Sequence, residues 1–391
     1  SHATLFTGLP PTAAGATAES HRLPEAALTL AERLVAAGYR TFGASCNSWV
    51  SVERGFAQGF EVFEEPWRLR GHGEPEEEAV RQVTGWIEEA AAGEAPAFFV
   101  VNLNGPHLPY DPPRELARRF VDPGWPGRRL GALSRIAGPW AHFTGALVLT
   151  PDDFAMLSQL YATEIHHADL QVGELLAALE RAGTRDETLV VVTSDHGENL
   201  GDHGRIGHAL SMYDTTLRVP LIVRYPPAFA AGTVVGELVS LLDVAPTVLS
   251  LTGAVAPGEA EETARRSLAG PRRGGRRFVV AENGRPLAAL ELLAESFPAF
   301  DARGIDHPML ALRTDRHKLV WKGEAGVELY DLAADPAELD DLSAAQPRVR
   351  DELLRGLELW REAVRSAEPA ELYRSEDEEA REWLRTLGYI Q

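Results

Sequence analysis

The sequence predicts an α/β fold, in which helices cover both faces of a large and mostly parallel sheet, followed by a small antiparallel sheet with a helix. Apolar runs typical of strands alternate with segments of helical period over residues 1–253. A stretch rich in Gly, Ala, Pro and Arg follows at 254–277 and is expected to be a linker. Residues 278–391 then show short strand-like runs separated by turn residues. We therefore expect an α/β/α sandwich followed by a C-terminal α+β subdomain.

In the first domain, strands are expected to be buried on both faces and helices to be amphipathic. The run at 189–192 is continuously apolar, as in a strand covered from both sides. Residues 111–149, rich in Pro, Gly and Trp, show no clear period and are expected to run over the surface as a wall of a cleft. We expect helices over 24–37, 76–92 and from Asp152 to Gly183, and strands over 40–45, 97–103, 189–192 and 219–224.

The second domain has a different pattern. Its apolar runs are short and are separated by turn residues, which predicts an antiparallel sheet. A helix of amphipathic period is expected to pack on that sheet, and a final short helix is expected after an acidic run. The expected strands are 278–282, 309–313, 317–322 and 327–330, the packed helix is 349–364, and the acidic run is 376–379.

Composition excludes several classes of partner. The net charge is −20, and no basic stripe is present that could displace counterions from a nucleic acid. No apolar run approaches the roughly 20 residues that a membrane span needs. The only lysines are Lys318 and Lys322, so an anionic ligand of the first domain would depend on Arg, His or a bound cation. A lone Cys46 excludes an internal disulfide. The oligomeric state is not predicted.

Three histidines follow the predicted strands on loops that this layout brings to one edge of the sheet. They are His107, His196 and His208, and Asp195 lies beside the second of them. Ligands of open α/β sheets bind beyond the carboxyl ends of the strands, and these side chains suit a divalent cation or a set of proton donors around an anion. The alternative is that Asp195 caps a helix starting at Gly197 and that each histidine is a solvated loop residue.

The phrases around these residues resemble the sulfatase-like branch of the alkaline phosphatase superfamily. SHATLFTG at the start resembles the segment after the family's nucleophile, which is normally Cys or Ser followed by x-Pro-Ser-Arg and a Leu-Thr-Gly ending. TSDHGENLGDHG and YDTTLRVPLIVRYP resemble the block around its metal site, and NGPHLPY and LRTDRHKLVW resemble further phrases in collinear order. The resemblance implies an alkaline phosphatase-like sandwich and a metal-dependent sulfuric or phosphoric ester hydrolase.

The resemblance also implies roles for individual residues. Asp195 and His196 would ligate one divalent cation, which is Ca, Mn or Mg. Zinc is less favoured, because two-zinc phosphodiesterase relatives carry an Asp followed four residues later by His and this chain has no such pair. His107 would contact the ester or protonate the leaving oxygen, and His208 would take the place of the Lys that many sulfatases set against the sulfate.

Two further residues are predicted to bind substrate. His2 stands where the sulfatase motif has Arg, and that Arg belongs to the signal that converts the nucleophile to formylglycine. Because His2 stands in place of that Arg, the nucleophile could instead be an unmodified Thr or Ser that acts on a phosphate ester, as in phosphodiesterase, phosphonate-hydrolase or phosphotransferase relatives. Asn47 follows the strand at 40–45 and either contacts substrate or caps a turn.

By the same resemblance the nucleophile position would lie three residues before Ser1, and an N-terminal pair of acidic ligands earlier still. The chain as printed is thus expected to be inactive or weakly active alone. The expected substrate is a small anionic ester, such as a sulfated or phosphorylated glycan or lipid headgroup. A non-catalytic relic that binds an anion or carbohydrate remains the alternative of another class. The compartment is left open, with a slight preference for the cytoplasm.

Overall fold

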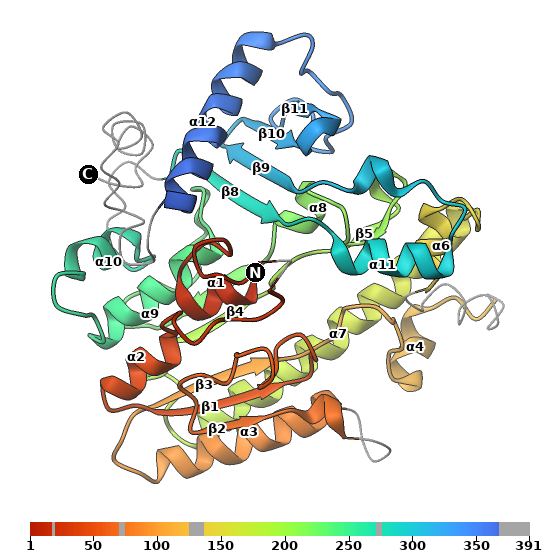
Figure 1. The fold of residues 1–391 in the computed structure, drawn as a ribbon. Coiled ribbons are helices and arrows are strands. Elements are labelled where there is room, and N and C mark those ends of the chain that lie inside the picture. Colours follow the sequence, from red (N-terminus) through yellow and green to blue (C-terminus); the bar gives the residue numbers. More distant parts are fainter. Residues whose placement is uncertain (18–19, 70–74, 125–136, 271–275, 367–391) are drawn as a thin grey trace.

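The computed structural model describes residues 1–17, 20–69, 75–124, 137–270 and 276–366 (Figure 1). The expected α/β class is confirmed, and so is the separate antiparallel sheet near the C-terminus. Figure 1 shows this C-terminal sheet at the top and the parallel sheet at the bottom, with α1 and β4 between them. Among the described residues, no helix combines the length and the apolar character needed to cross a membrane.

The parallel sheet has the strand order β2-β1-β3, from Val62–Glu64, Arg40–Ser45 and Ala97–Asn102. In its register Ser45 lies opposite Asn102, so the two longer strands end at the same edge. Gly43 allows the strands to pack closely, because a Cβ at this position would lie 2.5 Å from the Phe63 ring. The carboxyl ends of β1 and β3 therefore open side by side.

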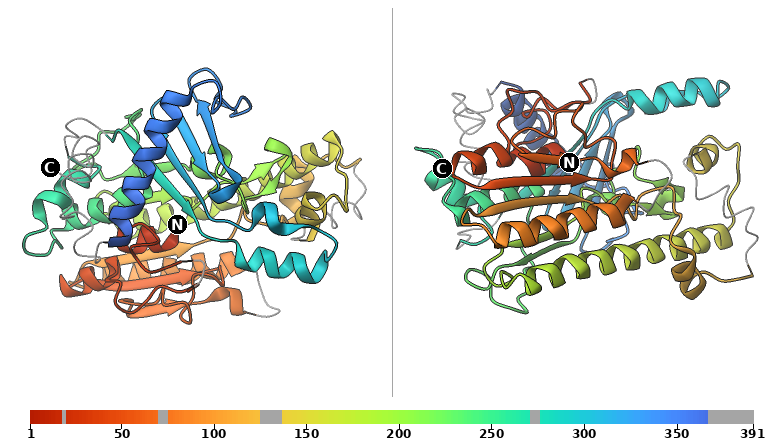
Figure 2. Two further views of the ribbon diagram at one scale, coloured as in Figure 1. Left: turned by 45° about the horizontal axis from the view of Figure 1, so that its top comes forward. Right: turned by 90° about the horizontal axis from the view of Figure 1, so that it is seen from below.

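Helices cover both faces of this sheet, as the sequence predicts. On one face α3 (Pro75–Ala91) and α7 (Pro151–Arg181) run side by side, as Figure 2 shows, and their apolar residues pack against Ala44 and Phe99. On the other face α2 (Leu30–Ala36) and α9 pack against Phe98. Alternate residues of β3 thus enter two separate cores, which is the pattern of a doubly covered strand.

Capping boxes set the starts of two helices. Thr29 accepts from the backbone N–H of Glu32, whose side chain accepts from the backbone N–H of Thr29. Helix α2 therefore begins at Leu30 and not at residue 24 as expected. Thr150 and Asp153 form the same reciprocal pair at the start of α7.

The second half of the first domain departs from the expected large parallel sheet. Strand β4 (Val190–Thr193) pairs antiparallel with β7 (Leu221–Arg224), and in the described residues this pair is a sheet separate from β1–β3. The chain between β4 and β7 forms a short hairpin of β5 and β6 and then helix α8, and η3 and α9 follow β7. The bounds are β5 Asn199–Leu200, η2 Asp202–Gly204, β6 Ile206–Gly207, α8 Asp214–Leu217, η3 Leu241–Asp243 and α9 Val244–Thr252.

Short helices occur where the sequence predicts irregular structure. The excursion at 111–149 contains α4 (Arg114–Phe120) and α6 (Ala137–Phe143), and residues 125–136 of it lie outside the described part. The chain also starts with a helix, α1 (His2–Thr7), ended by Gly8 at a φ of 71°. Three further 3₁₀ turns are η1 Pro66–Arg68, η4 Ala302–Ile305 and η5 Gly323–Ala325.

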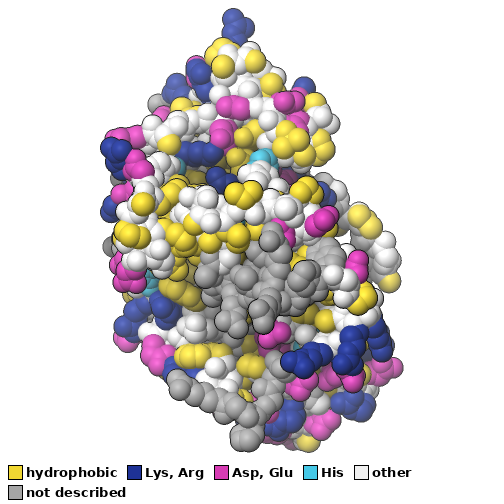
Figure 3. Space-filling view, turned by 90° about the vertical axis from the view of Figure 1, so that its right-hand side faces the viewer, with side chains coloured by type: hydrophobic (Ala, Val, Ile, Leu, Met, Phe, Trp, Pro, Cys, Tyr) yellow, Lys and Arg dark blue, Asp and Glu magenta, His cyan; other side chains and the backbone are white. Residues whose placement is uncertain are grey.

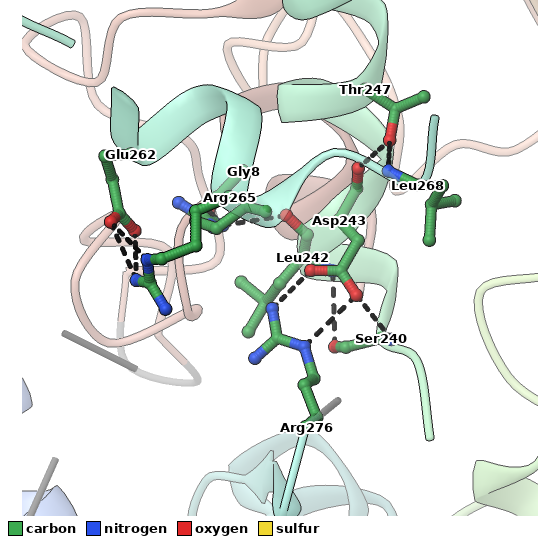
Figure 4. Close-up of polar contacts among 10 residues, drawn as sticks. Gly8, Ser240, Leu242, Asp243, Thr247, Glu262, Arg265, Leu268 and Arg276 are labelled. Carbon is green, nitrogen blue, oxygen red and sulfur yellow. Dashed lines mark hydrogen bonds and ion pairs between the residues drawn. The ribbon is translucent and has the colours of Figure 1, made fainter. Parts of the chain in front are cut away.

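The segment expected to be a linker includes helix α10 (Ala260–Arg266), which packs on α9. Figure 4 shows the polar contacts that tie this region to the first domain. Buried Asp243 accepts from the backbone N–H of Ser240 at 3.0 Å and from Arg276 Nε at 3.1 Å. Arg266 donates to the Leu242 carbonyl at 2.7 Å. The proposed division at 254–277 stays a prediction, and residues 271–275 of it lie outside the described part, but Arg266 and Arg276 both bind the first domain.

The C-terminal sheet has the order β11-β10-β9-β8 and is antiparallel throughout. Apolar residues of α12, among them Leu357 and Trp360, pack on the sheet residues Leu312, Leu319 and Leu329. The expected helix on this sheet is thus confirmed, whereas the expected final short helix lies outside the described residues. The bounds are β8 Phe278–Asn283, α11 Leu287–Ser296, β9 Met309–Thr314, β10 His317–Trp321, β11 Val327–Asp331 and α12 Pro347–Ser366.

Candidate active site

Three histidines from two distant parts of the chain meet beyond the ends of β3 and β4. One nitrogen from each of His107, His196 and His208 lies within 4.8 Å of the others. The ring centroids of His196 and His208 are 3.8 Å apart in a stacked arrangement, and the His107 ring lies 5.0 Å from His208 and 6.0 Å from His196. The sequence-based expectation that these loops converge agrees with this geometry.

The chain between His196 and His208 turns back on itself through buried polar contacts. Asn199 is fully buried, donates to the Gly207 carbonyl at 2.6 Å, and accepts from Thr215 Oγ1 at 2.7 Å. The Gly197 N–H donates to the Thr216 carbonyl at 2.9 Å. A Cβ at Gly197 would lie 2.2 Å from the Thr215 carbonyl oxygen, so only glycine fits between the two site residues His196 and Glu198. These contacts fix the hairpin that carries His208.

Asp195 lies between two imidazoles. Its Oδ2 is 3.4 Å from His196 Nε2 and 3.3 Å from His2 Nδ1. His2 in turn accepts at Nε2 from the Asn102 amide at 3.0 Å, and Asn102 accepts from Ser45 Oγ at 3.3 Å. This chain of contacts connects the N-terminal helix, the ends of β1 and β3, and the loop after β4.

Burial keeps these imidazoles neutral. It lowers the pKa of His2 to about 4, although the neighbouring Asp195 carboxylate acts in the opposite direction. Burial likewise lowers the pKa of His196, again against the pull of Asp195. For Asp195 itself, burial raises the pKa, but the imidazoles of His2 and His196 outweigh it and the net pKa is lowered. At neutral pH Asp195 is thus a carboxylate, and His2 and His196 are neutral imidazoles, which are the forms that bind metal ions.

Each histidine of the cluster uses its Nδ1 in a hydrogen bond. His196 Nδ1 donates to the Gly197 carbonyl at 3.0 Å, His107 Nδ1 donates to the Leu108 carbonyl, and His208 Nδ1 donates to Glu198 Oε1 at 2.7 Å. A neutral ring that donates at Nδ1 has an accepting Nε2, as in metal-bound histidines held from behind. The assignment of these tautomers follows from the hydrogen-bond partners.

The pair Asp195 and His196 fits a shared cation. With Nδ1 donating to Gly197, the His196 Nε2 lone pair faces the Asp195 carboxylate oxygen at 3.4 Å. Two acceptors at this distance repel each other unless a positive charge lies between them. Ligand atoms that bind one ion at about 2.1 Å lie at most about 4.2 Å apart, so this pair is already within range. The wider 4.8 Å limit of the three-histidine set is close to that range.

Glu198 and Tyr110 hold His208, and the sequence analysis did not single out either residue. The Glu198 side chain is only 3% exposed and accepts from His208 at one oxygen and from the Tyr110 hydroxyl at the other, at 3.1 Å. Burial and the Glu198 carboxylate raise the pKa of Tyr110, so its hydroxyl keeps its proton and donates. Tyr110 is itself packed against Leu157 and Leu160 of α7. The only sequence signal was that both residues stand within the phrases DHGE and PHLPY.

The six residues predicted from sequence have different surroundings. His107, Asp195, His196, His208 and His2 form one connected site. Asn47 follows β1, and its Oδ1 accepts from the backbone N–H of Trp49 at 2.8 Å, which is the geometry of a turn cap. The individual roles of all six residues stay predictions.

The fold and the cluster define an α/β protein with a histidine and aspartate cluster, at the carboxyl edge of its strands, that could hold a cation. The chain belongs to the sulfatase family, because the family model described as Sulfatase matches residues 1–254.

Individual sulfatases are also similar to parts of this chain. It is 28% identical over 215 residues to N-acetylglucosamine-6-O-sulfatase of Bacteroides thetaiotaomicron, a match covering 54% of this chain and 37% of the relative. It is 29% identical over 294 residues to the uncharacterized sulfatase YidJ of Escherichia coli, covering 72% and 55%. A steryl-sulfatase of Mus musculus is 34% identical over 214 residues, covering 46% and 34%. The matches to these curated relatives thus span between about a third and just over half of their length.

Solved structures share the fold. The structure of BT4656 in complex with D-glucosamine-2-N,6-O-disulfate matches with a TM-score of 0.69 at 20% identity, covering 94% of this chain and 88% of that one. The phosphonate monoester hydrolase of Agrobacterium radiobacter matches with a TM-score of 0.68 at 22% identity, covering 93% and 85%. The sulfatase-like family and the α/β fold expected from sequence are therefore confirmed.

Proposed function

We propose that the protein is a metal-dependent hydrolase of sulfate or phosphate esters, as the sequence analysis expects. The observation that carries the proposal is the arrangement of Asp195 and His196 as two facing acceptors, 3.4 Å apart, beside the rings of His107 and His208. This arrangement has three kinds of group that ester cleavage uses besides the nucleophile, namely ligands for a cation, imidazoles near the non-bridging oxygens, and a proton donor for the leaving oxygen.

Asp195 and His196 would hold the cation, which supplies positive charge to the non-bridging oxygens of the ester. His208, whose Nδ1–H is held by Glu198, would in its protonated form donate from Nε2 to the same group of oxygens. His107 keeps its Nδ1–H on the Leu108 carbonyl. In its protonated form it would donate from Nε2 to the leaving oxygen, as an attacking oxygen nucleophile bonds to sulfur or phosphorus and the bond to the leaving oxygen breaks. His2 orients Asp195, and Asn47 lies at the same edge of the sheet.

Among Ca, Mn and Mg we favour Mn for this site. Calcium and magnesium prefer oxygen ligands, whereas Mn²⁺ also accepts imidazole nitrogen, and one of the two proposed ligands, His196, is an imidazole. The metal requirement can be read out without turnover, by the shift in melting temperature when each ion is added to chelator-treated protein.

Phosphate chemistry is the second candidate. His2 stands where the sulfatase motif carries Arg, and its two ring nitrogens contact Asp195 and Asn102. One structural neighbour is a phosphonate monoester hydrolase, and the likeness to it concerns the fold. We propose that the substrate is a small anionic ester. The sequence analysis considers two forms of it, a glycan and a lipid headgroup, each carrying a sulfate or phosphate ester.

The test is a turnover assay on sulfate monoesters, phosphate monoesters, phosphate diesters and phosphonate monoesters, after chelation and after addition of Mn²⁺, Mg²⁺ or Ca²⁺. We expect His107→Ala and His208→Ala each to lower kcat by at least about 100-fold. His166→Ala is the matched control, because His166 lies on α7 against Phe120, away from the cluster. Unchanged turnover in both cluster variants, measured against the weak turnover expected of the chain as printed, would overturn the proposed roles. Anion binding at the cluster that metal addition leaves unchanged would favour the non-catalytic relic.

A further inference from the structure

A pocket of about 480 Å³ lies at the carboxyl edge of β1 and β2, and it contains Arg22, Arg54 and Arg68. One wall is the loop after β1, a second is η1, which follows β2, and the third is residues 20–22. Strands β1 and β2 are parallel, so the two segments that follow them leave the sheet at the same edge. Open α/β sheets bind ligands at this edge. The arginine pocket is thus placed like a ligand site, and it shares no lining residue with the histidine cluster.

Hydrogen bonds fasten the three walls of the arginine pocket to one another. The backbone N–H of Leu23 donates to the Arg54 carbonyl at 2.8 Å, and Arg54 Nη1 donates to the His21 carbonyl at 2.8 Å. The backbone N–H of Val52 donates to Glu65 Oε1 at 3.2 Å, which ties the loop to the residue before η1. The pocket is therefore formed before a ligand binds, which lowers the cost of ordering it on binding.

Two of the three arginines have charges that the protein leaves unmatched. Arg68 is matched, because Glu53 and Glu65 both pair with it. Arg22 and Arg54 form no ion pair with any residue that the structure describes. Glu53, the one carboxylate in the described lining, is already used by Arg68. The positive charge that a ligand would meet comes from Arg22 and Arg54.

Two tryptophans beside these arginines leave hydrogen-bond donors available. The guanidinium carbon of Arg54 lies 3.9 Å from the centroid of the Trp49 ring, and a guanidinium stacked on a ring keeps its N–H edge for other partners. The indole N–H of Trp67 is buried and has no acceptor among the described residues. A buried donor without an acceptor is unfavourable. An oxygen bound on the Trp67 side of the pocket would supply that acceptor.

The rest of the molecule disfavours anions. The net charge is −20, so an anion needs a local surplus of positive charge in order to bind. On the face that carries α4 and α6, the coloured acidic and basic side chains are interspersed and form no broad basic patch (Figure 3). An anion site in this protein therefore depends on individual arginines that carboxylates do not neutralise, as in the arginine pocket.

We propose that the arginine pocket is a second anion site, which binds a sulfate or phosphate group carried by a small organic molecule. The two unmatched charges of Arg22 and Arg54 balance a dianion, and guanidinium N–H groups suit the oxygens of a sulfate or phosphate. The volume of about 480 Å³ is more than three times the roughly 150 Å³ that holds one benzene molecule, so an organic part fits beside the anionic group. The inference does not depend on the proposed function, because it involves none of the residues of the histidine cluster.

The test measures binding of anions that contain no ester bond. The metal-loaded full chain is titrated at low salt with propylphosphonate, butyrate and inorganic phosphate, and dissociation constants are obtained by calorimetry. Propylphosphonate has the proposed dianionic group on a carbon chain, butyrate has a single charge on a chain of similar length, and inorganic phosphate is the free ion. We expect propylphosphonate to bind at least about tenfold more tightly than butyrate and about threefold more tightly than inorganic phosphate.

Variants locate the binding. Arg22→Gln should weaken propylphosphonate binding by about fivefold, and the exposed position of Arg22 makes a loss of folding unexpected. Arg303→Gln is the matched control for the change in net charge, because the Arg303 side chain is 91% exposed and lies outside the pocket. In His208→Ala the binding step that Arg22→Gln weakens should remain, whereas any further step at the histidine cluster should be lost.

Three outcomes would overturn the second site: Arg22→Gln binding propylphosphonate like Arg303→Gln, butyrate binding as tightly as propylphosphonate, and loss of all propylphosphonate binding in His208→Ala. The butyrate comparison uses unmodified protein and decides the matter even if Arg22→Gln does not fold. Inorganic phosphate binding as tightly as propylphosphonate would overturn the organic part of the ligand and assign the pocket to the free ion. Absence of ester turnover, by contrast, would reject the proposed function and leave the second anion site standing.

Discussion

Two clusters of ionisable side chains in this protein differ in burial and in how their charges are matched. In the first, Lys318 is fully buried and its Nζ lies 3.0 Å from Asp214 and 2.7 Å from Glu338, whose side chain is 2% exposed. In the second, the site at the sheet edge, Asp195 and His196 are about a quarter exposed and face each other as two acceptors. Opposite charges in the first cluster satisfy one another, whereas the second requires a ligand that the protein does not itself supply.

The first cluster also supports the second. Lys318 belongs to β10 of the C-terminal sheet, and Asp214 begins α8. Two residues further along α8, the Thr216 carbonyl accepts from the N–H of Gly197, beside His196. The C-terminal sheet thus holds the segment against which the site loop is fixed. The comparison indicates that the buried, matched charges of the first cluster stabilise the fold, and that the partly exposed acceptors of the second cluster are available for the chemistry of the site.

The largest expected effect concerns the buried cluster. Lys318→Met leaves the carboxylates of Asp214 and Glu338 without their main partner, and we expect the free energy of unfolding to fall by about 3–5 kcal/mol in a denaturant titration. Lys322→Met is the matched control, because Lys322 is the only other lysine and its pair with Glu328 is partly exposed. The control should lose no more than about 1 kcal/mol. Equal losses in the two variants would contradict the distinction between the clusters.

The second expected effect concerns the support of His208. Glu198→Gln removes the charge that fixes the His208 tautomer, and loss of such a partner behind a site histidine typically costs 10–100-fold in activity. We expect kcat to fall by about that factor, and the Nδ1 proton signal of His208 to move in an NMR spectrum. Tyr110→Phe, which removes only the second hydrogen bond to Glu198, should have a smaller effect of the same kind. A change confined to stability, with kcat and the Nδ1 signal unaltered, would give Glu198 a packing role instead.

The third expected effect is a small change in stability with a clear change in metal binding. His196→Ala removes one of two facing acceptors, so the free energy of unfolding should stay within about 0.5 kcal/mol of the unmodified protein in the absence of metal. Mn²⁺ affinity, measured by calorimetry, should fall at least tenfold. A destabilisation comparable to that of Lys318→Met would show that the two clusters contribute equally to stability. Retention of Mn²⁺ affinity would show that His196 is not a metal ligand.

The sequence predicted those features that depend on local patterns. Apolar runs and helical periods identified β1, β3, β4 and α7, and the phrase around Asp195 indicated the site edge. It did not identify Glu198 as the partner of Tyr110, because these residues are 88 positions apart and their contact exists only after α7 has packed. It also did not show that β7 pairs antiparallel with β4, because an apolar run carries no information on the direction of the neighbouring strand.

The smallest expected effect tests whether position at the sheet edge alone makes a group reactive. Cys46 directly follows β1, near the site, but it is only 6% exposed, and burial together with the charge of Glu76 raises the pKa of its thiol. The thiol is therefore protonated and shielded in the folded protein, and we expect no alkylation by iodoacetamide at pH 8 until the protein is unfolded, when one group per chain reacts. Mass spectrometry before and after denaturation checks this. Rapid labelling of the folded protein would show that nearness to the site, rather than burial, controls reactivity at this edge.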